Sequence, residues 1–320
     1  MINYSIIQKS QLEGAHRLDG EYYQPEYLDF EKKIKISGLY KLWSDIEGKF
    51  ITGPFGSEFN TENYVEDSQY RYIRGKDVKE FFLLDDDNVY IPEKDFERLK
   101  KYSLSENDIL ISVVGTLGNV AIVDKSNLPA IFSCKSTAFR TKAINPYYLL
   151  AYLNSKFGKG FLERNVRGTV QTGLNIDDLK NLIIYVPDSE RQNIIGSIIQ
   201  KAKSEIENSK SLYSQAEDLL LEGVGLKDFK IEDDLSYIVK LSDIKSSRRA
   251  DSEYFQPKYK KIISKINKQG ARPIGELSQL VGHATQSPYD EAGDIAVLAQ
   301  KHMKRNLVID TLAFDNYTME

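Results

Sequence analysis

The chain has 320 residues, 41% hydrophobic and 28% charged, with a formal net charge of −4, which excludes a wholly disordered chain and a uniformly basic nucleic-acid binder. The single cysteine, Cys134, and the three histidines exclude internal disulfides and cysteine-rich metal sites, and they argue against a metalloenzyme. At roughly 150 residues per domain, about two domains are expected. No apolar run reaches about 18 residues and the N-terminal segment is too polar for a signal peptide, so we expect a cytoplasmic protein without membrane contact.

The first half of the chain has the pattern of a mixed α/β fold. A helix is predicted to begin at Pro25, because proline suits the first turn of a helix, and short strands and turns follow over residues 43–123. Within them the apolar segments 108–114 and 119–123 form a predicted hairpin, because glycines interrupt the run between them. Further helix and strand patterns continue to residue 186.

A basic stretch crosses the middle of this half. Between Lys125 and Val170 there are eight basic residues and one acid, Glu163, which gives this stretch a net charge of +7. Such a run indicates either a solvated charged face or a surface that binds a polyanion. The eight are Lys125, Lys135, Arg140, Lys142, Lys156, Lys159, Arg164 and Arg167.

A long amphipathic helix is predicted to begin at Ser189, where Ser-Glu-Arg-Gln has the spacing of a capping box, and to end at Gly223. Its apolar positions recur in steps of three and four and so form a stripe along one side of a helix about 50 Å long. Such a stripe requires either a partner helix or a place in the core of one domain. We favour a partner, and the residues expected to bind it are Ile195, Ile198, Ala202, Ile206, Tyr213 and Leu220.

A segment near the N-terminus recurs later in the chain. Residues 16–27, HRLDGEYYQPEY, align with residues 248–259, RRADSEYFQPKY, at an offset of 232 residues. This offset is too long for a solenoid repeat and predicts a duplicated domain, with only the start of the second copy present. A helix is therefore predicted to begin at Pro257 as one does at Pro25.

With this duplication, four motifs in order resemble the specificity (S) subunits of type I restriction–modification systems. The motifs are GPFGS at 53–57, YIRGKDV at 72–78, the hairpin at 108–118, and GTVQTGLNI at 168–176, which leads into the long helix. The resemblance covers residues 10–235 well and 240–320 in part.

The resemblance implies a non-catalytic chain without a cofactor or metal, which recognises double-stranded DNA. Methyltransferase (M) subunits would methylate adenine and restriction (R) subunits would cleave DNA. The domains expected are a first target-recognition domain (1–187), a spacer and dimerisation helix (188–235), and the start of a truncated second recognition domain (236–320). A second molecule of this chain, paired through the long helix, is a further expected partner.

The DNA-binding residues are expected in loops and in the basic stretch. Arg74 is a candidate for a bidentate contact to guanine and Gln171 for one to adenine; the alternatives are a strand-edge ion pair and a loop-stabilising hydrogen bond. The full expected set is Arg74, Lys76, Lys135, Arg140, Arg164, Arg167, Gly168 and Gln171. Of these, Lys135, Arg140, Arg164 and Arg167 are expected on the surface that faces phosphates.

Two other function classes stay open from the residues alone. One is a coiled-coil scaffold with a binding domain for a ligand other than DNA, and the other is a methyltransferase or nuclease fragment. Neither G-x-x-x-x-G-K-[ST] nor a G-x-G-x-x-G after a strand occurs in the sequence, which disfavours a nucleotide-binding enzyme.

Overall fold

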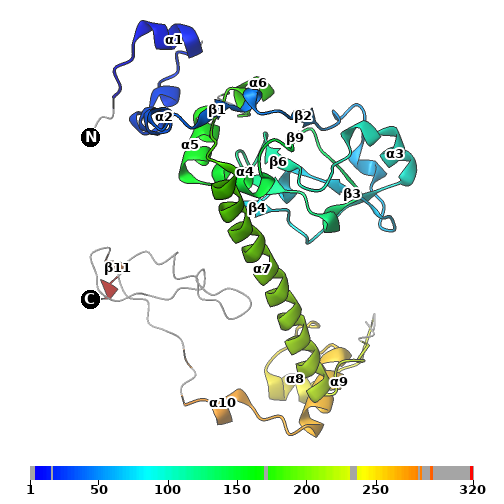
Figure 1. Ribbon diagram of the computed structural model, residues 1–320. Coiled ribbons are helices and arrows are strands. Elements are labelled where there is room, and N and C mark those ends of the chain that lie inside the picture. Colours follow the sequence, from blue (N-terminus) through cyan, green and yellow to red (C-terminus); the bar gives the residue numbers. More distant parts are fainter. Residues whose placement is uncertain are drawn as a thin grey trace. The chain divides into compact units, whose positions relative to one another are not determined.

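The computed structural model describes residues 4–15, 17–168, 172–230, 236–279, 282, 289–290 and 318–319 (Figure 1). The chain divides into two compact units, Met1–Ser204 and Glu205–Glu320. The division falls inside the long helix α7 (Ser189–Gly223), whose ends agree with those predicted. The mixed α/β fold expected from the sequence is confirmed.

The first unit contains a five-stranded and a three-stranded sheet. The five-stranded sheet has the order β2 (Lys49–Thr52), β9 (Ser136–Arg140), β6 (Ile109–Ser112), β7 (Val120–Ile122) and β4 (Phe81–Phe82). The three-stranded sheet has the order β5 (Tyr90–Ile91), β3 (Tyr70–Ile73) and β8 (Ala130–Phe132), with β3 and β8 parallel. A further pair, β1 (Tyr40–Leu42) and β10 (Ile183–Tyr185), is antiparallel.

The predicted hairpin is confirmed as β6 and β7, which pair antiparallel with Ile109 opposite Ile122. Side chains alternate between the two faces of a strand. Ile109 and Ile111 pack in one hydrophobic cluster, whereas Leu110 packs in another on the opposite face. Burial on both faces explains why this strand is an unbroken apolar run rather than an alternating one.

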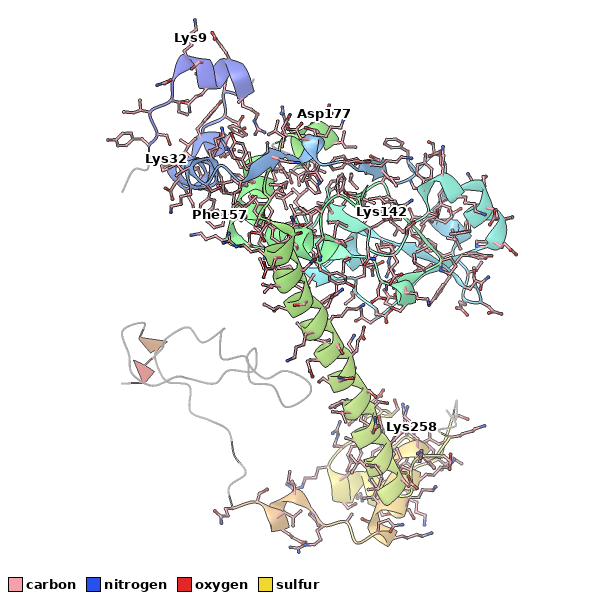
Figure 2. The ribbon with its side chains drawn as sticks, viewed as in Figure 1. Lys9, Lys32, Lys142, Phe157, Asp177 and Lys258 are labelled. Carbon is pink, nitrogen blue, oxygen red and sulfur yellow. The ribbon has the colours of Figure 1, made fainter. Side chains whose placement is uncertain are left out.

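Helices complete the first unit. In Figure 1, α4 (Pro146–Leu153) and α5 (Lys156–Arg164) lie beside the five-stranded sheet, and α4 contacts β7. The helix α2 (Pro25–Ile36) packs on α5, where the ring of Phe30 lies 5.0 Å from the ring of Phe157, the latter labelled in Figure 2. The remaining helices of the unit are α1 (Lys9–Ala15), α3 (Glu93–Arg98) and α6 (Ile176–Lys180).

The second unit begins with the end of α7 and continues with α8 (Leu241–Ser247), α9 (Pro257–Lys268) and α10 (Ile274–Leu277). A short strand pair, β11 (Tyr289–Asp290) with β12 (Thr318–Met319), is also described. None of the described helices in either unit has the length and apolar character needed to cross a membrane.

The internal repeat extends to the three-dimensional structure. The helices α1 and α8 begin and end at equivalent positions of the two copies, and α2 and α9 both begin at the repeated proline. The repeated Arg-x-Asp forms the same two-pronged ion pair in each copy, Arg17 with Asp19 and Arg249 with Asp251. The sequence duplication is therefore a duplication of local structure down to side-chain contacts.

Candidate nucleic-acid interface

Several of the predicted loops meet at one end of the two sheets. The strands β2, β3, β6 and β8 end there and β9 begins there, because Thr52 pairs with Thr137, Ser112 with Ser136, and Ile73 with Phe132. Loop 53–57 touches the turn after β8, since a Cβ on Gly53 would lie 2.5 Å from the carbonyl oxygen of Phe132. We name this end, with residues 53–57, 74–77, 115–118, 133–135, 167–168 and 172–174, the loop end.

Hydrogen bonds and close backbone approaches connect the other loops of the loop end. Thr116 Oγ1 donates to the Gly75 carbonyl oxygen at 3.4 Å, and a Cβ on Gly75 would lie 3.0 Å from Cβ of Lys135. Val114 forms a β-bridge with Gly173, which also pairs with Arg167. The structure therefore brings Arg74, Lys76, Lys135, Arg167 and Gly168 to one region.

Arg74 lies at the end of β3 and is held by Asp77. Its backbone N–H donates to Asp77 Oδ2 at 2.8 Å, and its Nε and Nη2 donate to the same carboxylate at 2.9 Å. These hydrogen bonds, the largest cause, raise the pKa of Arg74 above its usual value. Because Asp77 is 1% exposed, the Nε–Nη2 edge of Arg74 is bound to a buried partner. The structure thus contains the ion pair at the strand edge that was the alternative to a guanine contact.

Arg167 also has an acidic partner, but on a more open part of the loop end. Its Nε and Nη2 donate to Asp178 at 2.8 and 2.6 Å, which raises the pKa of Arg167. The next residue, Gly168, has φ of +98°, a conformation that L residues with side chains rarely adopt. Gln171 lies outside the described residues.

Arg140 lies at the opposite end of β9 from Lys135 and does not belong to the loop end. Its Nε and Nη2 donate to Asp108 at 2.8 and 2.7 Å, and these bonds raise its pKa. There it lines a cavity of about 610 Å³ with Lys142, labelled in Figure 2, and with Gln192 of α7. Lys135 and Arg140 are therefore separated by the length of β9.

The expected surface position of Arg164 is wrong, because its side chain is 7% exposed. It forms an ion pair with Glu31 at 2.6 Å, donates to the carbonyl oxygen of Tyr22 at 2.8 Å, and lies 4.0 Å from the centre of the Tyr22 ring. Arg164 thus fixes α5 to the N-terminal repeat.

The charge of +7 in the basic stretch does not produce an equally basic surface. Five of its eight cations form ion pairs with acids, and all five acids lie outside the stretch in the sequence. The pairs are Arg140–Asp108, Lys156–Glu26, Lys159–Glu80, Arg164–Glu31 and Arg167–Asp178, the last acid lying just beyond the stretch. Lys135, in contrast, is exposed at the loop end.

Comparison with known proteins decides the family. The model of the type I restriction modification DNA specificity domain matches residues 50–217, more than half of the chain. This chain belongs to that family. The matched residues include every strand of the five-stranded sheet except the first residue of β2, all of the loop end, and most of α7.

Individual relatives of this specificity-family chain are more distant. The type I restriction enzyme EcoBI specificity subunit of Escherichia coli is 29% identical over 97 residues, which are 30% of this chain and 20% of that subunit. The S subunit of a type I system from M. genitalium has 17% identity and a TM-score of 0.45 over 58% of this chain and 44% of that one. The HsdS subunit from Thermoanaerobacter tengcongensis has 17% identity and a TM-score of 0.37 over 62% and 48%. This chain spans a fifth of the length of the E. coli relative and less than half of each of these two structures.

The helix α7 of this specificity-family chain carries an exposed apolar stripe. At 100° per residue, Ile198, Ala202, Ile206, Tyr213 and Leu220 lie within about 80° of one another around the helix. Ile198, Ile206 and Leu220 are exposed, and Tyr213 is half-buried. Ile195, on the same side, packs instead against the core of the first unit, so its expected role in binding a partner changes to one of anchoring the helix.

The residues that sequence reasoning missed at the loop end are acidic. Asp77 holds Arg74, Asp178 holds Arg167, and Asp87 contacts both Arg74 and Lys76. For Asp77 a signal was available, because an acid three residues after Arg74 fits a capping position. Asp178 and Asp87, at eleven to thirteen residues from their partners, carry no such signal.

Proposed function

We propose that this chain selects the DNA sequence for a type I restriction–modification complex, in which M subunits methylate adenine and R subunits cleave. The family match supports DNA recognition, and the observation that carries the assignment to particular residues is the convergence of five loops at the loop end. Binding through loops held at the end of rigid sheets is a common arrangement, because the scaffold fixes positions while the loops vary.

At this site Lys76, Lys135 and Arg167 are proposed to contact phosphates, with Arg74 beside them. Gly168 allows the backbone of the loop to turn closely, and Gln171 keeps its proposed contact to adenine. Arg140 is proposed to contact the backbone separately, from the cavity at the start of α7. Arg164 is not among the proposed DNA contacts, because its side chain is buried.

The chain is proposed to carry no catalytic group or cofactor of its own. Among the described residues, no cluster of His, Cys, Asp and Glu side chains is arranged to hold a metal ion. Residues 1–187 are proposed as the recognition domain, 188–235 as the spacer helix and 236–320 as the beginning of a second recognition domain. The stripe on α7 is proposed to bind an M subunit, the segment near 230–247 or a second molecule of this chain.

Removing the two lysines of the loop end tests the site. For Lys76→Ala with Lys135→Ala, we expect weaker binding to all duplexes alike. The slope of the logarithm of the binding constant against the logarithm of the salt concentration should become shallower by about 2, since each lost phosphate contact reduces this slope by about 1. Fluorescence anisotropy with a mixed-sequence duplex over a salt series measures both quantities.

The control is Lys32→Ala with Lys100→Ala, which removes the same charge from exposed positions on α2 and after α3. The assignment of DNA binding to the loop end is supported if the control keeps the wild-type slope while the loop-end variant loses about 2. Equal slopes for the two double variants would show that binding depends on net charge and not on the loop end.

A further inference from the structure

Two cations of the loop end converge on one exposed carboxylate. Arg74 Nη1 lies 3.4 Å and Lys76 Nζ lies 2.8 Å from the same oxygen, Oδ2 of Asp87. Arg74 Nη2 also donates to the Asp87 backbone carbonyl oxygen. The hydrogen bond from Lys76, the largest cause, lowers the pKa of Asp87. An arginine and a lysine around a single anionic oxygen is an arrangement that also suits a phosphodiester oxygen.

The two acids that contact Arg74 differ in how tightly they are held. Asp77 is buried and forms a two-pronged pair, so it stays with Arg74. Asp87 is 72% exposed, and exposed ion pairs contribute little to stability because water and salt compete with them. Asp87 is therefore the exchangeable partner.

We propose that Asp87 occupies the place of a DNA phosphate, and that a phosphodiester oxygen displaces its carboxylate from Arg74 and Lys76 when DNA binds. This inference rests on the proposed DNA-binding function and gives Arg74 a different role from guanine recognition. The Nε–Nη2 edge stays on Asp77 and Nη2 keeps the Asp87 carbonyl oxygen, while Nη1 turns from the Asp87 carboxylate to the phosphate. Because the acid competes with every phosphate alike, it lowers affinity for all sequences without changing the preferred one.

The neighbouring acids supply a matched control. Asp85 pairs with the buried Arg71 and accepts from Asn88, so it has a structural role. Asp86 is exposed and one residue from Asp87. Asp86→Asn thus removes the same charge from nearly the same place without opening the cluster of Arg74, Lys76 and Asp87.

The experiment compares wild type, Asp87→Asn and Asp86→Asn for binding to a mixed-sequence duplex over a salt series. Asp87 has φ of +53°, and asparagine is among the residues that best accept this conformation, so the substitution keeps the backbone. We expect Asp87→Asn to bind about threefold to tenfold more tightly at low salt. The slope of the logarithm of the binding constant against the logarithm of the salt concentration should be steeper by about 1, because the phosphate no longer replaces a carboxylate. Adding Lys76→Met should reverse most of this gain.

The outcomes separate the two claims. If wild type binds and the two asparagine variants behave alike, DNA binding stands but displacement of Asp87 is contradicted, because only net charge matters. If wild type and all variants fail to bind the duplex, the DNA-binding function is contradicted as well.

Discussion

Arg164→Ala should destabilise the first unit by about 3 kcal/mol, since it removes the buried partner of an ion pair together with the other contacts of that side chain. Three contacts are lost: the ion pair to Glu31, the hydrogen bond to the Tyr22 carbonyl oxygen and the stacking on the Tyr22 ring. Glu31 keeps Lys35 as a partner, which places the expected loss at the lower end of the range for buried pairs. Urea unfolding at neutral pH measures the difference.

The effect should depend on pH. Burial alone would raise the pKa of Glu31, but hydrogen bonds from Lys35 and Arg164 outweigh it and lower the pKa below the usual value. A carboxylate with a lowered folded pKa contributes stability above its unfolded pKa, about 4.3, and this stability is lost as the pH falls through the folded pKa. The gap between wild type and Arg164→Ala should therefore shrink in acid.

Lys156→Ala is the matched control on the same helix. Its ion pair with Glu26 is exposed on both sides, so a change of less than about 1 kcal/mol is expected. If Arg164→Ala unfolded at the same urea concentration as Lys156→Ala, the structural role assigned to Arg164 would be wrong.

Ile198→Asp with Ile206→Asp should abolish assembly through α7 while leaving the chain folded. Both side chains are exposed in the single chain, 61% and 45%, so the charges cost little there. In a complex that covers the stripe, two unpaired carboxylates would cost several kcal/mol. Size-exclusion chromatography with light scattering, alone and with the M subunit, should show the loss of the wild-type complex.

Ser197→Asp with Ser204→Asp adds the same charge to exposed positions that lie about 150° around the helix from the centre of the stripe. This control should assemble as wild type does. Normal assembly of the isoleucine variant, with an unchanged circular dichroism spectrum, would show that α7 is an exposed spacer without a bound partner at this stripe.

Local patterns predicted the elements of this fold well. The start of α7 follows from a capping box and its end from Gly223, and the β6–β7 hairpin follows from an apolar run interrupted by Gly115 and Gly118. The repeat predicted α9 because both copies place proline at the first turn. In each case the physical cause lies within a few residues of its effect.

The site could be predicted only in part, because it depends on contacts between distant segments. Arg74, Lys76 and Lys135 meet since parallel β3 and β8 end together, a pairing that no local pattern reveals. The prediction that Arg164 lies on the surface was wrong for the same reason. Its side chain is buried against Glu31 and Tyr22, which precede it by more than 130 residues. Charge along the sequence therefore overstated charge on the surface.

Methylome sequencing of cells that carry this chain together with M subunits tests most directly whether the chain selects the DNA sequence. We expect adenine methylation at one motif, present only with this chain. Exchanging the segments 53–57, 74–77 and 168–176 for those of a family member with another target should change the motif. An identical motif with and without the chain, or after the exchange, would contradict the claim.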